Sequence, residues 1–338
     1  MNILVMKFGG TSLADPEKIQ RAAARVARAR RRGFAIAAVV SAPGRMTDEL
    51  LSLAQRVTRR TPPREQDVLM AAGEQISIAL LSAALAGRGI EAVSLTGAQA
   101  GIRARGPHGA ADIASLRPER VRLELARGRV AVVAGFQGID EKDDLVTLGR
   151  GGSDLTAAAL AAALKARACE IYTDVKGVYT ADPRLVPQAR KLKAVGFSEM
   201  LELAQAGAQV MQPRSVAYAR SRGVLLHVRS AFHDAEGTWI GARGQEGGSG
   251  VGALAVARLG AAARVSAVGR GLTRADAAAM RGILRGRGIS CRRLEQFPSR
   301  VSCLLDPRQA VEALRVLHRA WGLGRRAAYR AAIKTPGI

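Results

Sequence analysis

The chain has 338 residues, of which 48% are hydrophobic and 24% are charged, so it is long and apolar enough for about two globular domains. Its formal net charge is +24, but 44 of its 52 basic residues are arginines spread along the whole chain, and only 4% of its residues are aromatic. This composition lacks an obvious base-stacking surface. It argues against a specific nucleic-acid partner and favours solvated arginine-rich faces that bind polyanions weakly at low salt.

The sequence shows no signal for export or membrane insertion. No run approaches the roughly 18 unbroken apolar residues of a membrane span, and the N-terminus has no basic region or cleavage pattern. The three cysteines (Cys169, Cys291 and Cys303) are scattered and odd in number, which is typical of reduced thiols, and neither they nor the four histidines show metal-ligand spacing. We therefore expect a cytoplasmic protein without a membrane partner and without a metal held by a protein ligand set.

Strands and helices alternate through the first 230 residues. Apolar runs predict strands at residues 1–8, 35–40, 92–95, 130–134, 170–173 and 224–229. Helical spacing predicts helices at residues 15–32, 48–58, 65–86, 118–126, 155–165 and 198–206. This alternation predicts an α/β fold in which a mainly parallel sheet is sandwiched by helices.

A second, smaller domain is predicted after a glycine-rich segment. Strands at residues 254–259, 264–268 and 301–305, with helices at 275–285 and 309–321, predict a small α+β module. The predicted organisation is a catalytic domain over 1–234, a linker over 235–252, the module over 253–324 and a basic, poorly ordered tail over 325–338.

Two glycine-rich turns precede helices in the larger domain. Residues 7–12 read KFGGTS, where the glycines let the backbone approach an anion, the next helix directs N–H groups at it, and Lys7 adds a positive charge. The alternative is a tight turn with a surface lysine.

Residues 149–154 read GRGGSD, where Arg150 can grip a carboxylate with two hydrogen bonds and Asp154 can orient Lys7 or hold a metal. The alternative, a flexible loop, is disfavoured by two charges among the glycines.

Polar residues elsewhere are also candidates for binding. Thr173 and Asp174 end a strand at the expected carboxyl edge of the sheet, where open α/β sheets bind ligands. Tyr179 could pack on a nucleotide base or simply cover the core. Glu74 could take the ammonium group of an amino acid, or serve as a first-turn carboxylate favoured by the helix dipole.

Taken together and in this order, these segments resemble the aspartate kinases of the amino-acid-kinase family. The matching stretches cover most of residues 1–230, and GRGGSD and TDVKGVYTADPR are the most specific. They read KFGGTSLADPEKI, VVSAPGRMTDELL, GEQISIALL, SLTGAQAGI, AGFQGID, TLGRGGSDLTAAALAAAL, EIYTDVKGVYTADPRLVP and EMLELAQAGAQVMQPRSV.

The resemblance implies roles for individual residues. It implies that Lys7, Gly9, Gly10 and Asp154 lie at the transferring phosphate, with Lys7 and Asp154 as catalytic residues. Around aspartate it implies Ser41, Thr47, Glu74, Phe136, Arg150 and Ser153. Around ATP it implies Thr173, Asp174, Tyr179 and Arg184, together with the position of Gln209. The implied reaction transfers a phosphoryl group from ATP, carried with Mg²⁺, to L-aspartate, in a homo-oligomer that serves lysine, threonine and methionine biosynthesis.

The chain also departs from the family pattern. Gln209 and Gln212 stand where the family usually has lysine and histidine, and a neutral Gln209 should weaken ATP binding or turnover. Arg103 to Gly109 differs from the usual acidic pattern. The C-terminal module is similar to one of the family's paired ACT regulatory modules, without its partner. We therefore expect weak or absent feedback regulation.

Two alternatives to an active aspartate kinase remain open at this stage. One is a kinase of the same fold for another amino acid. The other is a catalytically weak paralogue that acts as a binding or regulatory subunit, for which Gln209 argues and against which Lys7, Arg150 and Asp154 argue.

Overall fold

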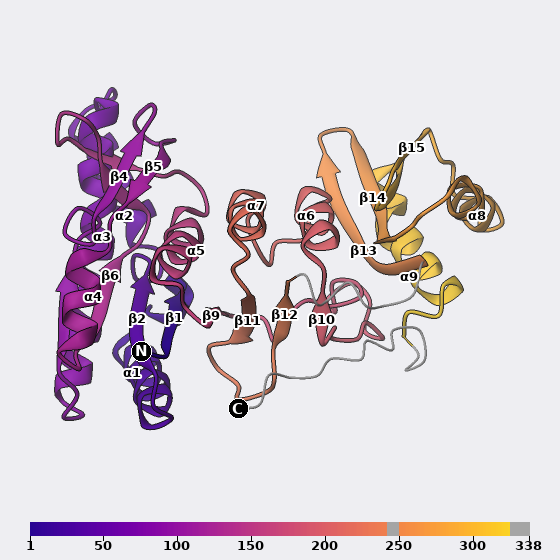
Figure 1. Ribbon diagram of the computed structural model, residues 1–338. Coiled ribbons are helices and arrows are strands. Elements are labelled where there is room, and N and C mark those ends of the chain that lie inside the picture. The colour runs from indigo at the N-terminus through magenta and orange to yellow at the C-terminus, as the bar shows by residue number, and fades with distance from the viewer. Residues whose placement is uncertain (242–249, 325–338) are drawn as a thin grey trace. The chain divides into compact units, whose positions relative to one another are not determined.

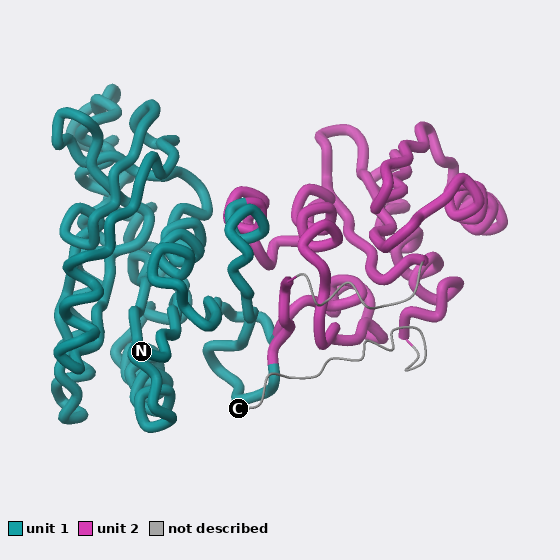
Figure 2. The backbone as a smooth tube through the Cα atoms, viewed as in Figure 1, with its two compact units in different colours: residues 1–176, 218–236 teal, residues 177–217, 237–338 magenta. Residues whose placement is uncertain are grey.

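The structure is a computed structural model that describes residues 1–241 and 250–324. It comprises two compact units that interleave along the chain (Figure 2). Unit 1 contains residues 1–176 and 218–236, and unit 2 contains residues 177–217 together with the described residues from 237 onward. Because the units interleave, the domain limits expected from sequence stay a prediction.

Unit 1 is built on six parallel strands in the order β11-β9-β1-β2-β6-β3 (Figure 1). The central strands are buried on both faces, as their unbroken apolar runs predict. The strands are β1 (Ile3–Phe8), β2 (Ala35–Val40), β3 (Ala92–Leu95), β6 (Val130–Ala134), β9 (Ala168–Thr173) and β11 (Leu226–Ser230).

Helices cover both faces of this sheet. Because crossovers between parallel strands are right-handed as a rule, the strand order puts α1 (Pro16–Arg31) and α3 (Pro63–Ala86) on one face and α4 (Glu119–Ala126) and α5 (Gly152–Leu164) on the other. In the described chain, only α3 is long and apolar enough to cross a membrane. It packs against α1, α2 (Met46–Val57), β3 and β6, so it serves as a core helix of unit 1.

A small second sheet completes unit 1. Its strands run in the order β5-β4-β7-β8 and comprise β4 (Ile102–Arg105), β5 (Asp112–Leu116), β7 (Gln137–Ile139) and β8 (Leu145–Thr147). The fully buried carboxylate of Asp67 on α3 anchors this sheet to the helix by hydrogen bonds. It accepts hydrogen bonds from the backbone N–H of Thr147 at 3.0 Å and of Gly109 at 3.0 Å, and His108 Nδ1 lies 2.8 Å away. A buried carboxylate with this many partners fixes the start of the GRGGSD turn relative to α3.

Unit 2 contains a four-stranded antiparallel sheet in the order β13-β14-β16-β15, with α8 (Arg274–Arg285) and α9 (Ala310–Ala320) packed on it and on each other. Its strands are β13 (Gly250–Leu259), β14 (Ala262–Arg270), β15 (Arg293–Phe297) and β16 (Arg300–Leu305). The helix α6 (Phe197–Gln205) contacts β13 and β14, and β10 (Ala194–Val195) pairs with β12 (Thr238–Ile240). The helix α7 (Pro213–Arg222) begins in unit 2 and ends in unit 1. The predicted α/β fold with a smaller α+β part is thus confirmed.

The structure differs from the sequence expectations in the linker and at two of the cysteines. Thr238–Ile240 form a strand inside the predicted linker, whose residues 242–249 lie outside the described residues, as does the predicted tail. The expectation of reduced thiols is wrong for Cys291 and Cys303, which form a disulfide with a Cα–Cα distance of 5.8 Å. The antiparallel pairing of β15 with β16 places Leu294 opposite Cys303 and brings Cys291, which lies two residues before β15, close to Cys303. Their spacing in the sequence did not reveal this.

Candidate active site

A cavity of about 310 Å³ lies in unit 1 at the carboxyl ends of β1, β2 and β6. The loops after these strands, the N-termini of α2 and α5, and Glu74 of α3 form its wall. Open α/β sheets bind ligands at this edge. The lining residues are Lys7, Gly10, Ser41, Ala42, Gly44, Thr47, Glu74, Phe136, Gly151, Gly152, Ser153 and Asp154.

A buried ion pair lies at the base of the cavity. Lys7 lies one residue from the end of β1, between Val39 of β2 and Ile171 of β9. Its ammonium Nζ is 2.7 Å from Oδ1 of Asp154, and the two side chains are only 11% and 12% exposed. Asp154 lies in the first turn of α5. The pair holds a cation against a helix N-terminus, which suits the charge of a phosphoryl group.

The first glycine turn has no room for a side chain at Gly10. A Cβ atom on Gly10 would lie 2.6 Å from the carbonyl oxygen of Ala42, and the Gly10 carbonyl accepts a hydrogen bond from Gly44 N–H at 2.9 Å. Gly9 donates its N–H to the carbonyl of Tyr172 and does not line the cavity. The turn after β1 therefore packs directly on the turn after β2, and this close approach explains the glycine at position 10.

Glu74 is a buried carboxylate with an unsatisfied oxygen. Its Oε1 accepts a hydrogen bond from the backbone N–H of Ala42 at 3.0 Å, while Oε2 has no hydrogen-bond partner among the described residues. Burial raises the pKa of Glu74 to about 7, although the Ala42 N–H and the charge of Lys7 act in the opposite direction. A buried, partly unsatisfied carboxylate in a cavity is suited to a cationic ligand group.

The second glycine turn packs against Phe136, whose backbone is strained. Phe136 has a φ of 68°, which is rare for a residue with a side chain, and its carbonyl accepts a hydrogen bond from Leu148 N–H at 2.8 Å. A Cβ atom on Gly152 would lie 2.9 Å from Cδ2 of Phe136. Ser153 and Phe136 line the cavity, whereas Arg150 is exposed and lies outside the lining.

Ser41 and Thr47 both line the cavity. The Ser41 N–H donates to the Phe8 carbonyl at 3.1 Å, and the Ser41 carbonyl accepts from the Ser77 hydroxyl at 2.8 Å. The structure thus gathers Lys7, Gly10, Asp154 and five of the six residues that the resemblance implies around aspartate. Sequence reasoning missed Ala42 and Gly44, for which the signal was the run SAPG directly after a buried strand.

The residues that the resemblance implies around ATP lie outside this cavity. In unit 1, the Thr173 hydroxyl donates to Asp174 Oδ1 at 3.0 Å at the end of β9. In unit 2, Tyr179 is half-buried, and exposed Arg184 binds the Asp182 carboxylate through Nε and a terminal nitrogen. Gln209 is exposed in the turn after α6.

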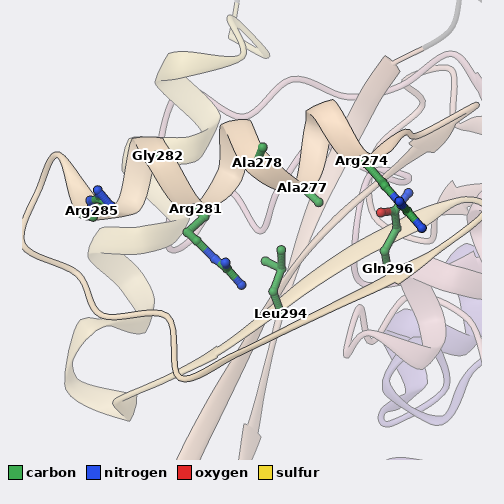
Figure 3. Close-up of a pocket in the computed structure, with 8 residues that line it drawn as sticks. All are labelled: Arg274, Ala277, Ala278, Arg281, Gly282, Arg285, Leu294 and Gln296. Atoms are coloured by element: carbon green, nitrogen blue, oxygen red, sulfur yellow. The ribbon is translucent and has the colours of Figure 1, made fainter.

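A second hollow, a groove of about 510 Å³, lies in unit 2 between α8 and β15 (Figure 3). Arg274 and Arg281 extend from the helix toward Gln296 and Leu294 on the strand, and Arg285 lies one turn after Arg281. These side chains are exposed, and the groove carries a strongly positive charge.

The described part of the chain contains no group of three or more His, Cys, Asp or Glu side chains that could hold a metal ion. The carboxylate of Asp154 is the acidic group nearest to Lys7 in the cavity.

A profile of the amino acid kinase family matches residues 2–230. The chain belongs to the amino acid kinase family. Among curated proteins, this family member is 51% identical to an aspartokinase of Thermus thermophilus over 240 residues, and 51% identical to an aspartokinase of Mycobacterium tuberculosis over 241 residues. Each match covers 71% of this chain but only 59% and 57% of the respective relative, so the chain spans less than two thirds of their length.

Solved structures show the same fold. Aspartokinase III of E. coli in complex with aspartate and ADP matches 94% of this chain and 99% of its own, with a TM-score of 0.81 and 22% identity. An aspartate kinase from Synechocystis matches 94% of this chain and 69% of its own, with a TM-score of 0.64 and 33% identity.

Proposed function

We propose that this family member phosphorylates the side-chain carboxylate of L-aspartate with ATP, giving 4-phospho-L-aspartate and ADP. The observation that carries the proposal is the Lys7–Asp154 ion pair in a cavity that also contains the unsatisfied oxygen of Glu74. The cavity thus offers a cation for a phosphoryl group and an anion for an ammonium group. The identity to curated aspartokinases supports this choice of substrate.

The chemistry needs no general base, because the acceptor carboxylate is already ionised at neutral pH. A carboxylate oxygen of aspartate attacks the γ-phosphorus of ATP, the bond from that phosphorus to the bridging oxygen breaks, and ADP leaves with the electron pair. The main difficulty is that two anions must approach each other. Lys7 and the N-terminus of α5 reduce this repulsion, and Asp154 orients Lys7.

Aspartate is held at both ends in this proposal. The ionised carboxylate of Glu74 takes its ammonium group, and Ser41, Thr47, Ser153 and Phe136 shape the pocket around it. Arg150 is exposed at the cavity's glycine turn, and it is proposed to grip a carboxylate of the substrate with its planar guanidinium.

ATP is proposed to contact Gly9, Gly10, Thr173, Asp174, Tyr179, Arg184 and the side chain of Gln209. Mg²⁺ commonly binds through one or two carboxylates, several waters and the phosphates of a nucleotide. Asp154 fits that description as a single carboxylate, so Mg²⁺ is proposed to enter with ATP, where it would neutralise phosphate charge.

Weak or absent feedback inhibition is part of the proposal. Lysine is a cation at neutral pH, and the groove between α8 and β15 carries Arg274, Arg281 and Arg285, which repel it. Threonine has no net charge at neutral pH, so the arginines of this groove do not attract it as they would an anion.

A homo-oligomer in the cytoplasm is also proposed. Val68, Ile76 and Leu80 of α3 are each more than 40% exposed, and they recur at multiples of four residues along one face of the helix. An apolar stripe of this kind is typical of a surface that another subunit covers.

Gln209 favours one alternative, a catalytically weak paralogue, because a neutral side chain cannot neutralise a phosphate. The test is the rate of ADP release with aspartate, with glutamate and without an acceptor. Release that requires aspartate supports the proposal, release that requires glutamate points to another acceptor, and release at the background rate with all three favours the weak paralogue.

A further inference from the structure

The loop formed by residues 177–192 is closed by backbone hydrogen bonds. Thr180 N–H donates to the Arg190 carbonyl at 2.8 Å, and Leu192 N–H donates to the Val178 carbonyl at 2.8 Å. Tyr179 and Lys191 form a bridge between them. The loop, which carries Tyr179 and Arg184, therefore projects from a fixed base.

The tip of the 177–192 loop belongs to the hydrophobic core of the C-terminal module. Ala181 is 3% exposed and Val186 is 1% exposed, and both pack in one cluster with Leu314 and Leu317 of α9. The loop also joins the module's sheet, because Leu254 N–H donates to the Thr180 carbonyl at 2.8 Å. Any movement of the tip would thus disturb the core of the module.

The helix α9 binds the loop through two side chains three residues apart. Arg315 Nε donates to the Leu185 carbonyl at 2.8 Å, and His318 Nε2 lies 3.0 Å from the hydroxyl oxygen of Thr180. The Thr180 hydroxyl also accepts a hydrogen bond from Arg190 N–H at 2.9 Å, so one hydroxyl joins both Arg190 and His318.

Two further features support this arrangement. Arg190 Nε donates to the Leu323 carbonyl at 3.2 Å, which ties the far side of the loop to the segment after α9. Burial and the nearby charge of Arg190 both lower the pKa of His318, which favours the neutral imidazole. The loop is thus held at Thr180, Leu185 and Arg190.

We propose that Arg315 and His318 are positioning residues for ATP, because α9 holds the 177–192 loop in the conformation that presents Tyr179 and Arg184 to the nucleotide. This inference rests on the proposed function, in which those two residues contact ATP. If so, the C-terminal module has a role that needs no regulatory ligand.

The experiment compares Arg315→Ala with Arg319→Ala in the full-length protein. Arg319 lies one turn further along the same helix and is also exposed. Because one charged hydrogen bond at an exposed site is lost, Arg315→Ala should raise the KM for ATP by about 3- to 10-fold. The KM for aspartate and kcat should stay at wild-type values, and Arg319→Ala should change none of these quantities.

Thr180→Val and Thr180→Ser test the other anchor. The valine variant loses the hydroxyl that joins Arg190 and His318, so its KM for ATP should rise, whereas the serine variant keeps the hydroxyl and should recover most of the wild-type value. An Arg315→Ala variant that melts at a lower temperature but has an unchanged KM for ATP would show a structural role only and overturn the proposal. Equal increases in both KM values would overturn it as well.

Direct titration of wild-type protein and Arg315→Ala with ATP separates the two proposals. If wild-type protein binds ATP without phosphorylating aspartate, the proposed function fails, and the affinity of the variant still decides whether α9 positions the loop. An affinity equal to that of wild-type protein would overturn the inference on its own, and wild-type protein that does not bind ATP would overturn both.

Discussion

Replacing Glu74 with glutamine should separate the electrostatic role of this side chain from its shape. Glutamine keeps an oxygen that can accept the Ala42 N–H, but it carries no charge. Glu49 on α2 is exposed, so Glu49→Gln removes the same charge from the surface and serves as the matched control.

The magnitude follows from the raised pKa of Glu74. A carboxyl with a pKa of 4.5 in the unfolded chain and about 7 in the fold contributes stability that is fully present below pH 4.5. That contribution is lost as the pH rises through about 7, and the loss amounts to about 3 kcal/mol at 1.36 kcal/mol per pKa unit. Without substrate at pH 8, Glu74→Gln should therefore be more stable than wild type, by up to about 3 kcal/mol.

Aspartate binding should change in the opposite direction. Only ionised Glu74 pairs with the ammonium group, so the affinity of wild-type protein for aspartate should fall about tenfold for each pH unit below about 7. Glu74→Gln should bind aspartate at least about 10-fold more weakly at pH 8 and should lose this pH dependence.

Denaturant unfolding of both proteins from pH 4.5 to pH 8 measures the stability difference, and titration calorimetry over the same range where both are folded measures aspartate affinity. Taking the difference between variant and wild type removes the contributions of other groups, such as Glu170, whose pKa is lowered to about 2 by His227, Arg229 and Tyr172 despite its burial. A stability difference that does not vary with pH would refute the raised pKa of Glu74. An unchanged aspartate affinity in Glu74→Gln would refute the binding of the substrate ammonium group by this side chain.

Three further substitutions and one ligand test follow from the same site. Lys7→Ala should reduce kcat by at least about 100-fold without unfolding the protein, because it removes the cation that stabilises the transition state, and steady-state rates with circular dichroism will check this. Arg150→Lys should raise the KM for aspartate, since lysine keeps the charge but not the planar two-bond grip. Gln209→Lys should lower the KM for ATP by about 10-fold or more, as expected for a charge-assisted contact to phosphate. Millimolar lysine and threonine, alone and together, should leave the kinase rate unchanged.

Each of these expectations has a clear contrary result. Near wild-type turnover in Lys7→Ala would show that the active site is not in this cavity. Wild-type kinetics in Arg150→Lys would make Arg150 a surface charge of the loop, and an unchanged KM for ATP in Gln209→Lys would place that position outside the nucleotide site. Strong inhibition by lysine or threonine would show that the protein has a regulatory site for that amino acid.

Most of the parallel strands could be predicted from sequence, because buried strands consist mainly of apolar residues. β2, β3 and β6 have the predicted boundaries. For β2 and β6 the reason is that a strand buried on both faces has an unbroken apolar sequence. The short strands β5 and β15 were not predicted, because most of their residues are exposed or half-buried. The fold class thus follows from the core alone, whereas the peripheral sheets depend on contacts that a local pattern does not contain.

The candidate site was predictable to a similar extent. Glycine turns beside Lys7 and Asp154 indicate phosphate chemistry, but the 2.7 Å ion pair joins residues far apart in the chain and only the fold brings them together. The left-handed backbone of Phe136 has no sequence signal, because its neighbours rather than its own preference impose it. The raised pKa of Glu74 likewise requires burial by the turn that contains Ala42.

Trapping of the product tests the central proposal most directly. An acyl phosphate reacts with hydroxylamine, so incubation of the protein with ATP, Mg²⁺, L-aspartate and hydroxylamine should yield the β-hydroxamate of aspartate, identified by mass spectrometry, in an amount equal to the ADP released. Lys7→Ala should yield none above background. ADP release without hydroxamate, or the same hydroxamate yield from Lys7→Ala, would contradict phosphoryl transfer to the aspartate side chain at this site.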